Sequence, residues 1–136
     1  MSKVVHFEIV ADEPEKLAKF YTDTFDWKIE EWKREGVIKE ENRYWMIMAG
    51  PKEEIGANGG MYKRQIPIAK GGVNAFVGNI AVTDIEKAAM MIKENGGKVQ
   101  EIMDIPDVGK SAAAEDPDGN NFAIFQADPN AKMQNM

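Results

Sequence analysis

The alternation of apolar and polar residues divides the chain into two halves with the same predicted order of elements. In the first half, residues 3–11 are rich in β-branched side chains and partly alternate, which predicts a strand. Apolar residues then recur at helical spacing from Leu17 to Phe25, which predicts a helix. Three more strands are predicted at 27–32, 43–49 and 60–64. The predicted order of the first half is therefore β-α-β-β-β.

Each predicted helix is preceded by a capping signal. Asp12 stands two residues before Pro14, so we predict that Asp12 caps the first helix and that Pro14 lies in its first turn. The pair Thr83-Asp84 takes the same place before the second helix, and a glycine-rich stop at 95–97 ends it.

The second half repeats the order of the first. Strands are predicted at 75–82, 98–105, 110–115 and 122–127. The run 116–120 (Asp-Pro-Asp-Gly-Asn) predicts a tight turn between the last two strands and lacks the further oxygen ligands of a calcium loop. We interpret 1–136 as a single domain, with module one at about 3–66, a linker at about 67–74, module two at about 75–127 and a mobile tail at 128–136.

The size of each half indicates how the halves combine. A half buries too little surface to be stable alone, so the two must share a core. The fold class is therefore α+β, with two paired β-α-β-β-β modules. Their helices are expected on the outer face of a curved sheet that surrounds a cavity.

Composition narrows the possible chemistry. The chain has 136 residues, no cysteine, a single histidine and a net charge of −6. This excludes thiolate chemistry and disfavours binding to nucleic acid, which needs clustered Lys and Arg. The sequence lacks a long apolar run, so we expect no membrane segment, and the absence of cysteine fits a cytoplasmic location. No Walker-type loop or G-x-S-x-G elbow is present.

Five short motifs recur along the chain in a fixed order: the strand at 5–9 (VHFEI), the helix at 16–21 (KLAKFY), and the segments 78–82 (GNIAV), 95–99 (NGGKV) and 115–120 (EDPDGN). In this order and spacing they resemble the vicinal oxygen chelate superfamily, the glyoxalase, bleomycin-resistance and extradiol-dioxygenase group. The resemblance covers residues 4–127 and implies paired modules, a homodimer and a site in the concave sheet.

The resemblance also implies where a metal would bind, because metal-dependent members take one ligand from each of four strands. The first position is His6, which matches. The others fall at or next to Gly59, at Asn79 and at Ala123 or thereabouts, and none offers a carboxylate or imidazole. Protein sites for transition metals usually need three or more ligands. We therefore predict no cofactor, and a divalent metal held by His6 with non-standard ligands is the alternative.

The candidate cavity combines these positions with neighbouring side chains. Its predicted members are His6, Glu8, Trp45, Gly59, Met61, Asn79, Ala123 and Phe125. His6 and Glu8 share a strand face, and His6 has several possible roles: lining the pocket, a plain structural role, metal binding or general-base catalysis. Asn79 is open to two interpretations, a contact to a polar ligand group or a bond to the local backbone. No catalytic residue is predicted.

The function predicted from these residues is small-molecule binding, or a metal-independent activity, with a modest organic molecule held in the cavity. A bleomycin-resistance-like protein belongs to this class, and the negative charge favours a cationic ligand. One alternative is a metal-dependent glyoxalase-like lyase or isomerase, or a dioxygenase. Another is an accessory module without chemistry. Whether the chain is an enzyme stays open at this point.

Overall fold

The computed structural model describes residues 6–33, 39–65 and 77–130. It is an α+β fold with two β-α-β-β-β-like modules and two mixed sheets. The chain divides into two compact units, Met1–Lys70 and Gly71–Met136, and the division falls inside the predicted linker. The linker itself lies outside the described residues.

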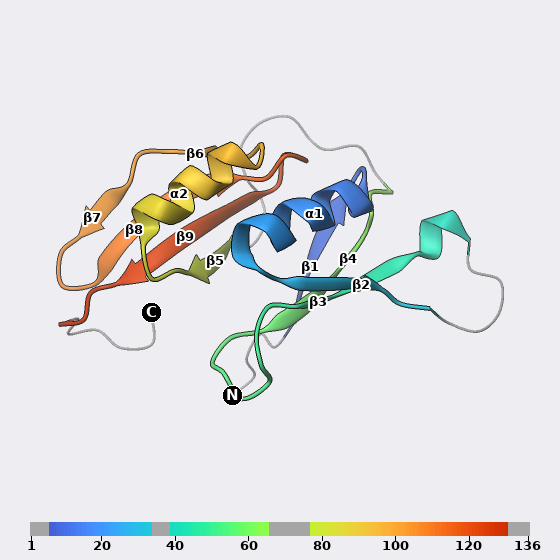
Figure 1. Ribbon diagram of the computed structural model, residues 1–136, viewed down its shortest axis with the longest axis horizontal. Helices are drawn as coiled ribbons and strands as arrows, with labels where there is room; N and C mark the ends of the chain where they lie inside the picture. The colour runs from blue at the N-terminus through green and yellow to red at the C-terminus, as the bar shows by residue number, and fades with distance from the viewer. Residues whose placement is uncertain (1–5, 34–38, 66–76, 131–136) are drawn as a thin grey trace. The chain divides into compact units, whose positions relative to one another are not determined.

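The first unit is a four-stranded mixed sheet with a helix on one face (Figure 1). Its elements are β1 (His6–Ala11), α1 (Pro14–Phe25), β2 (Lys28–Glu31), the 3-10 turn η1 (Glu40–Asn42), β3 (Tyr44–Met48) and β4 (Asn58–Lys63). The strand order is β1-β4-β3-β2. β1 runs parallel to β4, and the other two pairs are antiparallel.

The helical periodicity of α1 buries one apolar stripe against this sheet. Leu17, Phe20 and Tyr21 are buried, as predicted from their spacing. Tyr21 stacks on Trp27 with ring centroids 4.8 Å apart, and Trp27 also contacts the Phe7 ring of β1. Burial of each such large apolar side chain stabilises the fold by about 1.5–3 kcal/mol.

The prediction that Asp12 caps α1 is wrong. The residue at the cap position is Glu13, which makes no side-chain cap hydrogen bond. Asp12 instead accepts a 3.0 Å hydrogen bond from Arg64 Nε. The parallel pairing of β1 with β4 brings Arg64 to the end of β1, where its guanidinium forms a charge-assisted hydrogen bond with the Asp12 carboxylate. Pro14 does lie in the first turn, as expected.

The second unit is a five-stranded sheet covered on one face by a helix (Figure 1). Its elements are β5 (Gly78–Ala81), α2 (Ile85–Glu94), β6 (Lys98–Val99), β7 (Met103–Ile105), β8 (Gly109–Glu115) and β9 (Asn121–Ala127). The order is β5-β9-β8-β6, with β7 also paired to β8. Buried residues of α2, such as Ile92, face buried residues of the sheet, such as Ile124.

Both ends of α2 match the prediction from sequence. The Asp84 carboxylate accepts a 3.1 Å hydrogen bond from the backbone N–H of Lys87, which satisfies one of the free donors of the first turn. Gln126 of β9 accepts from the Ile85 N–H at 2.8 Å. At the other end, Gly96 has a φ of +92°, the left-handed region that glycine adopts without strain.

The single strand predicted at 98–105 is in fact two short strands, β6 and β7, on the same edge of β8. Val99 pairs with Ala114, whereas Met103 pairs with Ser111, so β8 has one residue fewer than the facing chain between these pairs. One extra residue interrupts an antiparallel ladder as a bulge does. The periodicity of the sequence does not reveal such an insertion.

The turn predicted at 116–120 is confirmed and is held by a buried carboxylate. Asp116 is only 3% exposed. Its Oδ1 accepts from the backbone N–H groups of Asp118 and Asn120, both at 2.9 Å, and its Oδ2 accepts from the Asn120 side chain. The carboxylate is used in building the turn between β8 and β9.

None of the helices in the described parts of the chain is long and apolar enough to cross a membrane. Residues 131–136 of the predicted tail lie outside the described residues.

Candidate functional site

The four-stranded sheet has one face covered by α1 and one face that is not. We call the second one the open face. It carries these residues: His6, Glu8, Lys28, Glu30, Tyr44, Met46, Met48, Asn58, Gly60 and Tyr62. The alternation along β3 makes the two faces distinct, because Trp45 and Ile47 are buried whereas Met46 and Met48 are exposed.

Three polar side chains on the open face form a hydrogen-bonded group, which we call the trio. The Tyr44 hydroxyl of β3 donates to Glu8 Oε2 of β1 at 2.8 Å. His6 Nε2, also on β1, lies 3.0 Å from the same hydroxyl and 3.7 Å from Glu8 Oε2. The His6 and Glu8 side chains are 50% and 45% exposed, so the trio is open to an incoming molecule.

The direction of these bonds determines which atoms remain free to bind. An ionised carboxylate only accepts hydrogen bonds, so the single proton of the Tyr44 hydroxyl is committed to Glu8. The bond between His6 and Tyr44 then requires Nε2–H as the donor. In a neutral imidazole this leaves Nδ1 as an acceptor.

The environment also keeps Tyr44 protonated. Partial burial, followed by the hydrogen bond to Glu8 and the charge of that carboxylate, raises the pKa of Tyr44 to about 12. A phenolate next to the Glu8 carboxylate would place two negative charges in contact. Tyr44 therefore acts as a neutral donor at any pH near 7.

A glycine makes the room that Tyr44 occupies. Gly60 of β4 pairs with Glu8 on one side and Met46 on the other, so it lies between the strands that carry the trio. A Cβ added at Gly60 would overlap the Tyr44 ring and its hydroxyl. Because Gly60 has no Cβ, the Tyr44 side chain can cross β4 at this position and reach Glu8 on β1.

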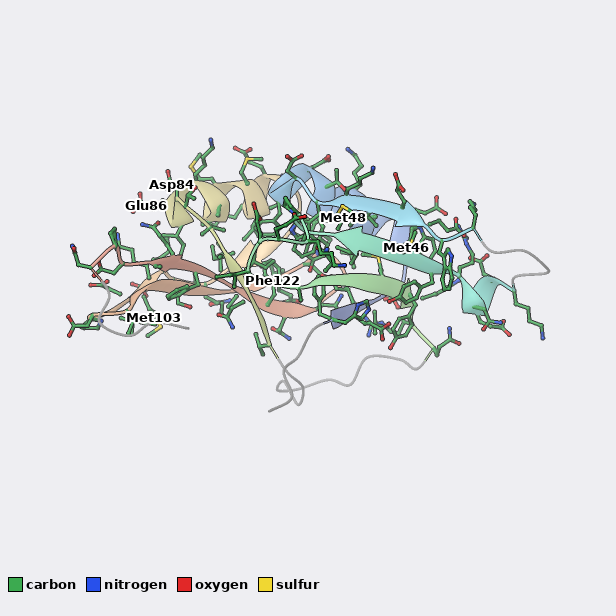
Figure 2. The ribbon with its side chains drawn as sticks, turned by 90° about the horizontal axis from the view of Figure 1, so that it is seen from below. Met46, Met48, Asp84, Glu86, Met103 and Phe122 are labelled. Atoms are coloured by element: carbon green, nitrogen blue, oxygen red, sulfur yellow. The ribbon has the colours of Figure 1, made fainter. Side chains whose placement is uncertain are left out.

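Apolar side chains lie beside the trio on the same face. Met46 and Met48 are 46% and 55% exposed, and Figure 2 labels both along β3. The Trp32 ring meets the Tyr44 ring edge-to-face at 6.5 Å. Flexible thioethers and an aromatic edge form a surface that adapts to apolar ligands of different shape.

The structure separates the predicted site residues of the first unit. His6 and Glu8 lie together on the open face. Trp45 and Met61 are buried under α1, at 5% and 0% exposure. Gly59 faces the same way, since a Cβ there would meet the Phe7 side chain and carbonyl oxygen. These three do not share a surface with His6 and Glu8, because strand alternation places them on the helix-covered side.

The remaining predicted residues lie in the second unit. Asn79 of β5 pairs directly with Ala123 of β9, and Phe125 is two residues further along β9 on the same face. The Asn79 amide donates to the Val77 carbonyl oxygen at 3.3 Å, which is the local backbone bond that the sequence left open. A single cavity framed by both units stays a prediction.

A comparison with protein families matches residues 3–124 to the glyoxalase/bleomycin resistance protein/dioxygenase superfamily. The chain belongs to this superfamily. The resemblance inferred from the short motifs is thereby confirmed. A comparison with curated protein sequences finds no match.

Solved structures of several superfamily members share this fold. TnmS3, an antibiotic-binding protein from a Streptomyces species, is 23% identical with a TM-score of 0.63, over 94% of this chain and 98% of that one. A glyoxalase I mutant from Zea mays is 24% identical with a TM-score of 0.69, and covers 91% of this chain but 45% of the maize protein.

The fosfomycin resistance protein FosX from Listeria monocytogenes is 12% identical with a TM-score of 0.69, over 98% of this chain and 97% of that one. Its structure contains Mn(II) and 1S,2S-dihydroxypropylphosphonic acid. Similarity to structures at these levels of sequence identity establishes the fold. It does not establish the activity, which depends on the residues of the site.

The donor set of this superfamily member does not fit the metal centre of its metal-dependent relatives. Among the described residues, no three or more His, Asp or Glu side chains are grouped so that they could hold a metal ion. His6 Nε2 and Glu8 Oε2 are both engaged by Tyr44. Of the positions that the resemblance implied as ligands, Gly59 and Ala123 have no side-chain donor atoms.

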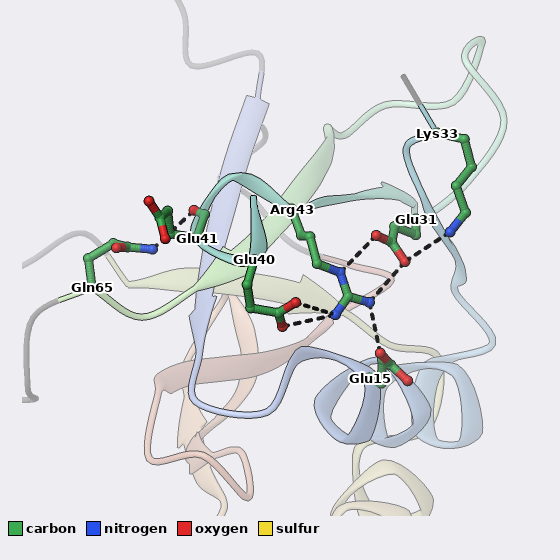
Figure 3. Close-up of polar contacts among 7 residues, drawn as sticks. All are labelled: Glu15, Glu31, Lys33, Glu40, Glu41, Arg43 and Gln65. Carbon is green, nitrogen blue, oxygen red and sulfur yellow. Dashed lines mark hydrogen bonds and ion pairs between the residues drawn. The ribbon is translucent and has the colours of Figure 1, made fainter. Parts of the chain in front are cut away.

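A second polar cluster in the first unit is structural. Figure 3 shows Arg43 surrounded by the carboxylates of Glu15, Glu31 and Glu40. It forms a two-pronged contact with Glu31, Nε to Oε2 at 2.8 Å and Nη2 to Oε1 at 3.0 Å. The guanidinium also lies over the buried Trp45 ring, 4.8 Å from its centroid. The cluster ties α1, β2 and η1 to the start of β3.

Acid is expected to weaken this cluster at a defined pH. The hydrogen bonds from Arg43 lower the pKa of Glu31 from 4.5 to about 2, against the opposing effect of burial. A carboxyl whose pKa is lowered by folding stabilises the protein above its unfolded pKa, and loses that contribution as pH falls through the folded value. The urea midpoint of Glu31→Gln should therefore lie below that of the unsubstituted protein near pH 7, and the gap should close between pH 4.5 and 2.

The matched control for this prediction is Glu30→Gln, which removes the same charge from the same strand outside the Arg43 cluster. Its midpoint should follow that of the unsubstituted protein across the whole pH range. A gap for Glu31→Gln that stays constant down to pH 2 would contradict the assigned ion pair.

Proposed function

We propose that this superfamily member binds a small organic molecule on the open face of its first sheet. The observation that carries the proposal is the combination of the trio with Met46 and Met48 on a sheet face that α1 does not cover. Small-molecule sites combine an apolar surface with a few convergent polar groups, and both are present here.

The exposed methionines support the proposal independently of the trio. Their neighbours on β3, Trp45 and Ile47, are buried and are the residues of this strand that belong to the core. Met46 and Met48 do not belong to that core and leave about half of their surface exposed, and exposed apolar surface is typical of binding sites. The fold shared with TnmS3, which binds an antibiotic, is compatible with this role.

The proposal predicts that at least one compound in a panel of antibiotics, including bleomycin and fosfomycin, raises the melting temperature of the protein. A ligand that binds only the folded state stabilises it by mass action. For each compound that does so, the double variant Met46→Ala/Met48→Ala should weaken binding by about tenfold, since two thioether contacts are lost. Isothermal titration measures the affinity.

Met103→Ala is the control, because Met103 is 66% exposed and belongs to the second unit. It should leave the affinity unchanged within about twofold. A panel without any stabilising compound would count against the function. A compound that binds the double variant as tightly as the unsubstituted protein would place its site elsewhere.

A further inference from the structure

The chemistry of the trio selects among small molecules. The atoms of the trio that remain free to bind another molecule are all hydrogen-bond acceptors. The Tyr44 proton is committed to Glu8 and the His6 Nε2 proton is committed to Tyr44. The Glu8 carboxylate and His6 Nδ1 remain, and both accept hydrogen bonds when His6 is neutral.

The charges on the open face also favour a positively charged ligand. On β2, Lys28 Nζ lies 3.5 Å from Glu30 Oε1, so the charges of these two side chains offset each other. The two arginines of the described first unit are engaged by other carboxylates, Arg43 by its cluster and Arg64 by Asp12. Glu8 therefore carries the uncompensated negative charge of the open face when His6 is neutral, and the whole chain has a net charge of −6.

We propose that the trio is an acceptor subsite for a protonated amine, with the Glu8 carboxylate as its counter-ion. Tyr44 is a positioning residue that holds Glu8 and His6 in place, and His6 Nδ1 accepts a further N–H or O–H of the same molecule. This inference rests on the proposed function and narrows its ligand class to organic amines whose apolar part lies against Met46 and Met48.

The first test compares two fluorescent probes that share the dansyl group and differ in the charge and length of the attached chain, and the Glu8→Gln variant then isolates the effect of charge. Dansylcadaverine carries a primary amine, which is protonated at pH 8 because such amines have a pKa near 10.4. Dansylglycine carries a carboxylate. When His6 is neutral, the Glu8 carboxylate alone sets the charge of the subsite. Dansylcadaverine is expected to bind at least about fivefold more tightly, as measured by fluorescence titration.

Glu8→Gln keeps the shape of the side chain and removes its charge. It should weaken the binding of dansylcadaverine by about fivefold, the effect of one partly exposed ion pair, and leave dansylglycine no weaker. Glu30→Gln removes a charge from the same face outside the trio and should change neither affinity by more than about twofold. Equal binding of the two probes, tighter binding of dansylglycine, or an unchanged affinity in Glu8→Gln would overturn the amine subsite.

These outcomes are distinct from failure of the proposed function. If neither probe binds while an antibiotic of the panel does, the amine inference is wrong and the binding function stands. If the panel and both probes fail, both are wrong.

The second test observes the ring of His6 directly. His6 is the only histidine of the chain, so its two ring nitrogens can be assigned without ambiguity in a long-range proton–nitrogen NMR spectrum of the ¹⁵N-labelled protein. At pH 8 we expect Nε2 to be protonated and Nδ1 to be unprotonated. Addition of dansylcadaverine should shift the Nδ1 resonance and leave Nε2 largely unchanged.

Tyr44→Phe provides the readout for the positioning role. It removes the acceptor of the Nε2–H bond, so the Nε2 resonance should move before any probe is added, with the far-UV circular dichroism unchanged. A protonated Nδ1 in the unsubstituted protein, or an Nδ1 resonance that does not respond to saturating dansylcadaverine, would overturn the assignment.

Discussion

Asp116→Ala is expected to lower the free energy of unfolding by about 3 kcal/mol, since it removes an acceptor of several hydrogen bonds from a buried turn. The carboxylate is 3% exposed and accepts from two backbone N–H groups and one side-chain amide. Without it the donors of Asp118 and Asn120 lose their partner where water has little access. Urea unfolding followed by far-UV circular dichroism measures the change.

Asp116→Asn and Asp104→Ala serve as controls for this prediction. Asparagine keeps an oxygen at the Oδ1 position and loses the charge, so its effect should be intermediate. Asp104 is an exposed carboxylate of the same unit, and its removal should change stability by less than about 0.5 kcal/mol. Equal stabilities for the Ala variants at 104 and 116 would show that the turn does not depend on its carboxylate.

Gly59→Ala is expected to destabilise the first unit by about 3 kcal/mol, near the upper end of what overpacking usually costs. A Cβ at Gly59 would overlap the Phe7 carbonyl oxygen and lie 2.9 Å from the Phe7 ring. The carbonyl belongs to the neighbouring parallel strand, so β1 would have to move away from β4. Such a movement breaks ladder hydrogen bonds as well as packing.

Gly78→Ala is the matched control, because an added Cβ there meets nothing within 4 Å. Its stability should change by less than about 0.5 kcal/mol. Far-UV circular dichroism follows the unfolding of both variants, and the fluorescence of Trp27, Trp32 and Trp45 adds a signal specific to the first unit. Equal unfolding curves for the two variants would contradict the close approach of β1 and β4.

The site depends on the register of three strands. The parallel pairing of β1 and β4 places Glu8 opposite Gly60, and the antiparallel pairing of β4 and β3 places Gly60 opposite Met46. Tyr44 lies two residues from Met46 on the same face of β3, so its side chain reaches Glu8 across the gap at Gly60. A shift of one residue in either pairing would turn Tyr44 or Glu8 to the other face.

Local patterns in the sequence determined the elements and their order. The stripe from Leu17 to Phe25 predicts α1 because helical spacing is visible within a few turns. The Asp84 cap and the turn at Asp116 depend on side chains that bond to backbone groups two to four residues away. The superfamily follows from the same local motifs in their correct order.

Only the tertiary structure decided how distant residues combine. Sequence alternation separates Tyr44 from Trp45 but does not say which of them faces α1. The bond from Tyr44 to Glu8 joins residues 36 apart in the chain, and Arg64 takes Asp12 away from its expected cap over a separation of 52. These outcomes depend on strand pairing, which is fixed by contacts far apart in the chain, whereas periodicity and capping are set by neighbouring residues.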